Sequence, residues 1–331
     1  MARQPAAQTS TPATFASIFE SIVANVSTVI HGKDEPIRLA LVCLLTEGHL
    51  LLEDVPGVGK TTLAKALARS FDLECRRIQF TPDLLPSDVT GVSVYDRGTG
   101  SFSFRPGPVF ANVVIGDEIN RASPKTQSAL LEAMQERQVT IDATTHPLPA
   151  PFLVIGTQNP IEHEGTYPLP ESQLDRFLLR IRMGYPDRQA ELTMLEASGV
   201  TGDGRDAESL PVVADARTVP ALVEAARRVH TAPALRGYVV DLATATRSHP
   251  ALGLGMSPRS TLALQGAART LAASSGRDYV IPDDIKVLFG PVVEHRLVLS
   301  PEAVVSGVEL REVLSDILRS VPVPSGRSGP G

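Results

Sequence analysis

The amino-acid sequence predicts an α/β protein with a mainly parallel five-stranded sheet, followed by a smaller all-helical domain. Three observations lead to this expectation. Short apolar segments alternate with helical segments between residues 15 and 186, whereas apolar residues from 187 to 320 recur at helical spacing. A glycine-rich turn joins the first apolar segment to a helical one. Strands that alternate with helices pair in parallel, and helices cover both faces of their sheet.

Five short apolar runs in the first region, residues 15–186, are interpreted as strands. Each run is too short for a typical helix and is bounded by polar or turn residues. The helical segment 61–70 lies between the first two runs, as a strand–helix–strand unit requires. The predicted strands are residues 49–53, 74–80, 112–115, 152–156 and 177–183.

Two hairpins are expected to interrupt this alternation. Residues 92–105 alternate in polarity around a glycine-rich turn, and residues 139–149 form a similar pattern. A helix between them is expected to have Ser123 as its N-cap and Pro124 in its first turn. Its apolar stripe is predicted to consist of Leu130, Leu131 and Met134.

The second region, residues 187–320, is expected to form the helical domain. A polar loop at residues 199–211 lies near its beginning. The chain is expected to end in flexible tails at residues 1–14 and 321–331, which are rich in small and polar residues. The predicted helices are residues 187–197, 219–230, 235–248, 257–274 and 283–297.

Composition limits the classes of partner. The 331 residues suffice for about two domains. The net charge of −6 disfavours general attraction to nucleic acid or to an anionic membrane. Cys43 and Cys75 have no CxxC spacing, so we expect buried free thiols rather than a metal site or a disulfide. No signal peptide and no apolar run long enough for a bilayer are recognised, which makes the cytoplasm the expected location.

The strongest local motif is the phosphate-binding loop at residues 54–61, DVPGVGKT. It follows a predicted strand and opens a predicted helix, which is the setting such a loop needs. Glycines let backbone N–H groups approach phosphate oxygens, and the helix N-terminus favours an anion. Lys60 is expected to reach the β- and γ-phosphates, and Thr61 to bind Mg²⁺. The nucleotide-binding residues are predicted to be Pro56, Gly57, Val58, Gly59, Lys60, Thr61 and Thr62.

Asp54 departs from the motif G-x-x-x-x-G-K-[ST], which has glycine at this position. Aspartate tolerates left-handed backbone geometry better than most residues. Its charge would oppose a triphosphate unless the carboxylate points away. The alternative interpretation of the segment is an ordinary glycine-rich turn.

Two further polar clusters follow predicted strands. Asp117 and Glu118 come after the run NVVIG, where the aspartate would orient Mg²⁺ and the glutamate would act as general base. Such a pair could instead cap the next helix. Asn159 lies in the polar cluster after the strand 152–156 and could position the attacking water, because ligands bind at the carboxyl ends of parallel strands. Alternatively it is a turn residue before Pro160.

Several longer segments resemble the MoxR family of AAA+ ATPases. They are residues 116–138 (GDEINRASPKTQSALLEAMQERQ), 157–177 (TQNPIEHEGTYPLPESQLDRF), 256–259 (MSPR), 276–284 (GRDYVIPDD) and 294–297 (EHRL). The resemblance extends from about residue 29 to residue 299. It implies an AAA+ αβα core with a helical lid and identifies Asn159 as sensor 1.

The resemblance also assigns two arginines. Arg176 is identified as the arginine finger, which reaches the nucleotide of a neighbouring subunit; alternatively it pairs locally with Asp175 or Glu171. Arg259 resembles sensor 2, in cis or in trans, and could instead be a solvent-exposed first-turn residue. The adenine edge would be lined by Val29, Ile30 and His31. Phe102, Phe104 and Arg105 of the first hairpin would contact substrate or partner, unless that hairpin packs on its own core.

The resulting hypothesis is a Mg²⁺-dependent ATPase that forms a homo-oligomeric ring, expected to be a hexamer. The resemblance implies remodelling or maturation of a client protein, with a partner that carries a von Willebrand factor A-type domain. A chelatase-like motor subunit is one alternative. A nucleotide switch or scaffold without hydrolysis is another, and Asp54 is the residue that suggests it. The acidic balance argues against a DNA-associated regulator, and no direct membrane insertion is expected.

Overall fold

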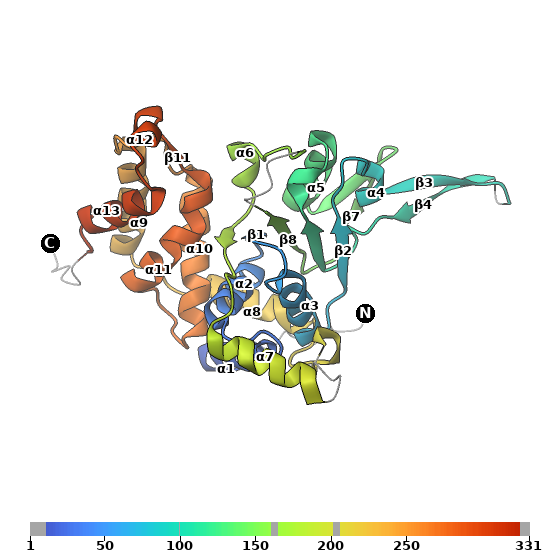
Figure 1. Cartoon of the computed structure of the whole chain (residues 1–331), viewed down its shortest axis with the longest axis horizontal. Coiled ribbons are helices and arrows are strands. Elements are labelled where there is room, and N and C mark those ends of the chain that lie inside the picture. The colour runs from blue at the N-terminus through green and yellow to red at the C-terminus, as the bar shows by residue number, and fades with distance from the viewer. Residues whose placement is uncertain (1–10, 99, 160–164, 201–205, 325–331) are drawn as a thin grey trace, which may run out of the picture.

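A parallel sheet of five strands lies beside a helical part in the computed structural model, which describes residues 11–98, 100–159, 165–200 and 206–324 (Figure 1). The strand order is β2-β5-β8-β1-β9, and every neighbouring pair runs parallel. All five predicted strands are present. They are β1 (Leu50–Glu53), β2 (Cys75–Gln79), β5 (Val113–Asp117), β8 (Leu153–Gln158) and β9 (Leu179–Ile181).

The sheet separates two apolar clusters, because successive side chains of a strand point to opposite faces. In β1, Leu50 and Leu52 belong to one cluster and Leu51 belongs to the other. Helices cover both faces, so all three leucines are buried. Helices α1 (Pro12–Ser27), α2 (Asp34–Leu45) and α3 (Lys60–Ser70) contribute to the first cluster, which continues into the helical part of the chain. Helices α4 (Pro86–Thr90) and α5 (Pro124–Glu136) contribute to the second.

Helix α5 begins as the sequence predicts. The hydroxyl of Ser123 accepts a hydrogen bond from the backbone N–H of Thr126 at 3.4 Å, and Pro124 occupies the first helical position. The three predicted stripe residues are buried in the second cluster. A short 3₁₀ turn, Ile119–Arg121, precedes the helix.

The predicted N-terminal tail is too long. Helix α1 begins at Pro12, so residues 12–14 of the predicted tail 1–14 are helical. Thr11 caps the helix by accepting a hydrogen bond from the backbone N–H of Thr14 at 3.3 Å. Phe15 and Phe19 then bury the helix against the first cluster. Residues 1–10 of that tail lie outside the described part of the chain.

Two antiparallel hairpins overlap the ranges 92–105 and 139–149. The first pairs β3 (Gly91–Asp96) with β4 (Ser101–Pro106), and Figure 1 shows it extending away from the sheet. The second pairs β6 (Gln138–Ile141) with β7 (Thr144–Pro147). Tyr95 and Phe102 of the first hairpin are exposed and lie with ring centroids 5.2 Å apart. Phe104 stacks on His146 of the second hairpin.

The helical part also contains a short antiparallel strand pair. Strands β10 (Leu252–Leu254) and β11 (Val298–Leu299) pair within it. The sequence predicted helices for this part of the chain but not this strand pair. Helices α12 and α13 were not predicted. The helices are α8 (Thr218–Arg228), α9 (Pro233–Ser248), α10 (Pro258–Ser274), α11 (Pro282–Val293), α12 (Pro301–Val305) and α13 (Leu310–Ser320).

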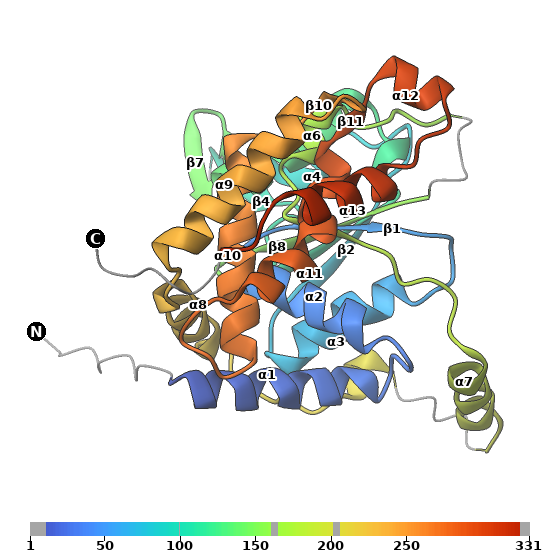
Figure 2. The same cartoon turned by 90° about the vertical axis from the view of Figure 1, so that its left-hand side faces the viewer.

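The segment between the sheet and these helices contains α7 (Arg188–Val200). Figure 2 shows α7 apart from both the sheet and helices α8 to α13. A 3₁₀ turn at Ala207–Ser209 packs on α3, where Lys65 pairs with Glu208 at 2.7 Å. The division of the chain at residue 186 therefore stays a prediction. Residues 201–205 of the polar loop and residues 325–331 of the predicted C-terminal tail lie outside the described residues.

Both cysteines are free thiols. Cys43 is buried, which raises the pKa of its thiol, whereas Cys75 in β2 is only half-buried. Among the described residues, no helix combines the length and the apolar character that crossing a membrane requires.

Candidate nucleotide-binding site

The phosphate-binding loop connects β1 to α3, as predicted. Gly57 and Gly59 have φ angles of 84° and 91°, a left-handed geometry that side chains rarely adopt. Gly59 is the N-cap of α3, so the N–H groups of the first helical turn lie at the end of the loop. The loop borders a cavity of about 380 Å³.

This cavity brings together most of the predicted site. From the loop and α3 it is lined by Pro56, Gly57, Gly59, Lys60, Thr61 and Thr62. From the carboxyl ends of the neighbouring strands it is lined by Arg77, Gln79, Asp117, Glu118 and Asn159. Val58 instead packs against the first apolar cluster. The parallel order of β2, β5, β8 and β1 places these strand ends at one edge of the sheet.

Asp54 turns its carboxylate away from this cavity. Its two oxygens accept hydrogen bonds from the backbone N–H of Val55 at 2.9 Å and of Gly184 at 2.5 Å. Only 8% of the residue is exposed. The backbone carbonyl of Asp54 accepts a hydrogen bond from Lys60 Nζ at 2.7 Å. The residue therefore anchors the loop to the segment after β9, and its charge is directed at backbone donors.

Replacing Asp54 with alanine is expected to destabilise the protein by about 1–3 kcal/mol, because two partly buried N–H groups lose a charged acceptor. Denaturant unfolding of the wild type and the variant measures this difference. Asp54→Asn keeps one acceptor oxygen and should lose less. An Asp54→Ala protein as stable as the wild type would show that these hydrogen bonds contribute little.

Asp117 and Glu118 lie at the carboxyl end of β5, where the sequence placed them. Asp117 Oδ1 accepts a hydrogen bond from the hydroxyl of Thr157 at 2.6 Å. Glu118 adopts a left-handed φ of 56°, and its backbone N–H donates to the same hydroxyl at 3.0 Å. Thr157 of β8 therefore holds both residues of the pair. Glu118 occupies the N-cap position of the 3₁₀ turn Ile119–Arg121 but makes no side-chain capping hydrogen bond there, and Ser123 caps α5.

Two residues of β2 were missed by the sequence analysis. Arg77 Nη2 pairs with Asp117 Oδ2 at 2.6 Å, and Gln79 Nε2 donates to Glu118 Oε2 at 2.9 Å. Arg77 also donates to the Gln79 amide oxygen at 2.7 Å, which links the two side chains. Gln79 stands opposite Asp117 in the parallel register. Their spacing of two residues in a predicted strand was the signal that could have identified them.

The predicted adenine edge lies next to the loop. Val29, Ile30 and His31 form the turn between α1 and α2. A methyl group placed on Gly59 would lie 3.6 Å from Ile30 Cδ1, so Ile30 lies beside the loop. None of these three residues is among the described residues that line the 380 Å³ cavity. Their contact with adenine stays a prediction.

Arg176 and Arg259 lie away from the cavity of their own chain. Arg176 borders a separate hollow of about 520 Å³ together with residues of α5. Within the described residues, no ion pair joins Arg176 to Asp175 or Glu171, which were its alternative partners. Arg259 is exposed near the start of α10. The N-cap of that helix, Ser257, contacts Asp175 Oδ2 at 3.3 Å. Both arginines therefore flank one contact between α10 and the segment after α6 (Glu171–Leu174).

Comparisons with known proteins agree with this arrangement. A family model described as "ATPase family associated with various cellular activities" matches residues 49–179, and one described as an AAA lid domain matches residues 244–317. The first range runs from β1 to β9, and the second from α9 to α13.

The relatives cover almost the whole chain. YeaC of Bacillus subtilis is 48% identical over 92% of this chain and 95% of that protein. Chaperone MoxR1 of Mycobacterium tuberculosis is 43% identical over 94% and 84%, and Protein MoxR of Paracoccus denitrificans is 32% identical over 93% and 96%. A crystal structure of a Cytophaga hutchinsonii protein superposes with a TM-score of 0.87 at 38% identity, covering 95% of this chain and 97% of that one.

Proposed function

Because this chain belongs to the MoxR family of AAA+ ATPases, we propose that it hydrolyses ATP in the cavity between the phosphate-binding loop and the strand ends. The strongest support is that one cavity is lined by Lys60, Thr61, Asp117, Glu118 and Asn159. These side chains come from three separate segments of the sequence. Only the fold brings them to one edge of the sheet.

Each lining residue has a role that its chemistry allows. The N–H groups at Gly57, Gly59 and the start of α3 would bind phosphate oxygens, and Lys60 would neutralise the β- and γ-phosphates. Glu118 would accept a proton from the attacking water, which Asn159 would help to position.

The residues fit a magnesium ion. Mg²⁺ prefers oxygen ligands and is usually held by one or two protein groups together with waters and phosphates. The Asp117 carboxylate and the Thr61 hydroxyl supply such oxygens at the cavity. The ion would neutralise charge on the phosphates. Thr157 fixes Asp117 Oδ1, whereas Oδ2 pairs with the exposed side chain of Arg77, which a bound ion would replace.

Hydrolysis is proposed to require a ring, since Arg176 and Arg259 do not reach the cavity of their own chain. Arg176 would act as arginine finger for the neighbouring subunit, and Arg259 would act in trans beside it. A hexamer is the expected assembly. Native mass spectrometry in the presence of ATP would detect the hexamer. A protein that remains monomeric at concentrations at which it hydrolyses ATP would contradict the proposal.

The ATP cycle would remodel or mature a client protein in the cytoplasm. A partner with a von Willebrand factor A-type domain is proposed to deliver this client. The exposed Tyr95 and Phe102 of the β3–β4 hairpin offer an apolar contact surface for client or partner. ATP-dependent co-elution of a purified partner of this type would support the proposal. Co-elution that is the same with and without ATP would contradict it.

Release of phosphate from ATP tests the central proposal. The wild-type protein is expected to release phosphate in the presence of Mg²⁺, and the Lys60→Ala variant is expected to lose ATP binding and turnover together. Lys65, one helical turn further along α3, pairs with Glu208 outside the cavity and provides the matched control as Lys65→Ala. If the assembled wild-type protein releases no phosphate with Mg²⁺, it is not an ATPase.

A further inference from the structure

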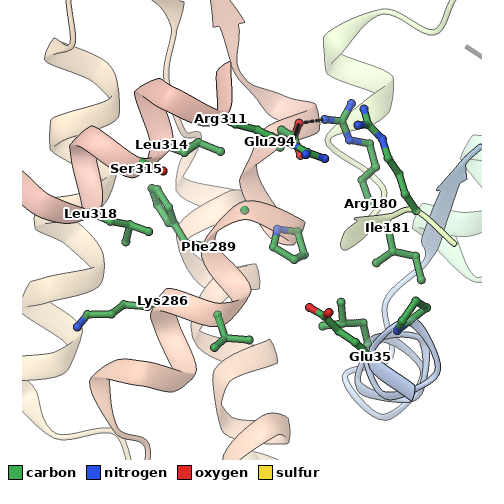
Figure 3. A pocket seen from close by; sticks show the side chains of 16 residues that line it. Glu35, Arg180, Ile181, Lys286, Phe289, Glu294, Arg311, Leu314, Ser315 and Leu318 are labelled. Carbon is green, nitrogen blue, oxygen red and sulfur yellow. Dashed lines mark ion pairs between the residues drawn. The ribbon is translucent and has the colours of Figure 1, made fainter. Parts of the chain in front are cut away.

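The turn Glu294–Arg296, which directly follows α11, connects the helical part to the sheet. Glu294 Oε1 pairs with Arg180 Nη2 of β9 at 2.8 Å. Figure 3 shows this pair beside a cavity of about 480 Å³ that lies between β9 and the helices α11 and α13. Arg180 also pairs with Glu53 at 3.2 Å, the last residue of β1 before the phosphate-binding loop. The first residue of the turn is thus tied to the sheet edge.

The next two residues of this turn bind the backbone immediately after Arg176. Arg296 Nη2 donates to the carbonyl oxygen of Phe177 at 2.6 Å, and His295 Nε2 contacts the same oxygen at 2.9 Å. Phe177 is buried in the second apolar cluster. Its carbonyl is therefore held from the helical side by two side chains, while its ring is held by the sheet side.

Arg296 also contacts the residue immediately before Arg176. Its Nε lies 3.4 Å from Asp175 Oδ1. The hydroxyl groups of Ser257 and Ser260, at the start of α10, contact the same carboxylate at 3.3 and 3.4 Å. Residues 175 and 177 are thus both bound to the helical part, and Arg176 lies between them.

The contacts of the buried Arg296 side chain with Asp175 and Phe177 are not explained by stability alone. Only 4% of the Arg296 side chain is exposed, and within the described part of the chain its Nη1 has no hydrogen-bond partner. Burial lowers the pKa of Arg296 to about 10, although the Asp175 carboxylate raises it, so the side chain is charged at neutral pH. A buried ion pair commonly stabilises a protein no better than apolar residues of similar size. The planar guanidinium group of arginine can, however, hold two hydrogen-bond partners in a fixed geometry.

We propose that Arg296 is a positioning residue for Arg176: by binding Asp175 and the carbonyl of Phe177, it sets the direction in which Arg176 leaves the subunit. The inference rests on the proposed role of Arg176 in the neighbouring subunit's site. Misplacement of a catalytic group by about 1 Å can cost a hundredfold in rate. Arg296 would therefore govern turnover without touching nucleotide, and the helical part would control the site of the next subunit.

The variant Arg296→Lys tests this inference. Lysine retains the charge for Asp175 but lacks the guanidinium fork that also reaches Phe177. We expect kcat to fall about tenfold, with the KM for ATP unchanged, because the variant's own cavity is intact. Mixed with Lys60→Ala chains, whose Arg296 and Arg176 are unaltered, the variant should regain turnover. A general loss of stability would not produce this rescue in trans.

A second variant and a control distinguish the proposed effect from misfolding. Asp175→Asn keeps an acceptor oxygen for the serine hydroxyls, removes the charge that pairs with Arg296, and should show the same kcat loss and rescue. The control is Arg277→Lys, which weakens another arginine–carboxylate pair of the helical part, with the buried Asp284, and should keep wild-type kcat.

The outcomes separate this inference from the proposed function. If Arg176→Ala is rescued by Lys60→Ala chains but Arg296→Lys and Asp175→Asn keep full kcat or are not rescued, Arg296 does not position Arg176 and the ATPase proposal remains. If Arg277→Lys loses as much kcat as Arg296→Lys, the effect is general and the inference fails. If Arg176→Ala itself keeps full turnover, the arginine-finger role fails and the inference fails with it.

Discussion

Substituting Glu118 with glutamine is expected to lower ATP turnover by about 10²- to 10⁴-fold while ATP binding is retained. Glutamine has the shape of glutamate but cannot accept the proton of the attacking water. The side chain is already held in place, since Gln79 donates to Glu118 Oε2 at 2.9 Å and Arg121 Nη1 donates to it at 3.0 Å. An amide oxygen can accept these hydrogen bonds, so the geometry of the cavity should persist.

Two measurements decide this prediction. The release of phosphate gives kcat, and binding of a fluorescent ATP analogue gives the dissociation constant for wild type and variant. Glu302→Gln in α12, an exposed glutamate of the helical part, is the matched control and should keep both values. A Glu118→Gln protein with wild-type kcat would remove Glu118 from the role of general base.

Substituting Arg176 with alanine is expected to lower turnover by about 10³- to 10⁵-fold, with ATP affinity unchanged. The guanidinium would stabilise charge on the transferred phosphoryl group, which develops only during the reaction. Binding of the ground state should not need it, because Arg176 lies outside the cavity that the chain forms with its own loop.

The same variant tests whether the site is shared between subunits. Lys60→Ala chains cannot use their own cavity, but they carry an intact Arg176 for a neighbour. Mixed rings of Arg176→Ala and Lys60→Ala chains should therefore regain part of the wild-type turnover. Arg236→Ala on the exposed face of α9 is the control and should remain fully active. If mixed rings assemble but remain inactive, Arg176 does not act in a site that is shared between subunits.

The structure bears on one alternative hypothesis. Asp54 suggested a nucleotide switch without hydrolysis, because its charge would oppose a triphosphate. In the structure the carboxylate binds the N–H groups of Val55 and Gly184, so this residue gives no reason to expect impaired nucleotide binding. The direction of the side chain depends on Gly184, which is 130 positions away in the sequence, and could not be predicted from the loop itself.

Local patterns account for the parts of the fold that the sequence predicted. Apolar runs of strand length, the glycines at 57 and 59 and the cap at Ser123 act through residues close in the chain, and each was found where it was predicted. Helix α1 was not predicted, and its first turn has the small, polar composition of the tail before it. Its burial depends on packing of Phe15 and Phe19 against the first cluster.

By itself, the sequence determined the five strands, the phosphate-binding loop and the acidic pair, because short-range periodicity and backbone geometry specify them. Only the tertiary structure decided which side chains meet. Arg77 and Gln79 reach Asp117 and Glu118 because β2 lies beside β5, and Arg296 reaches the residues around Arg176 because α11 ends against the sheet. Such contacts join segments about 40 to 120 residues apart, and no local pattern encodes them.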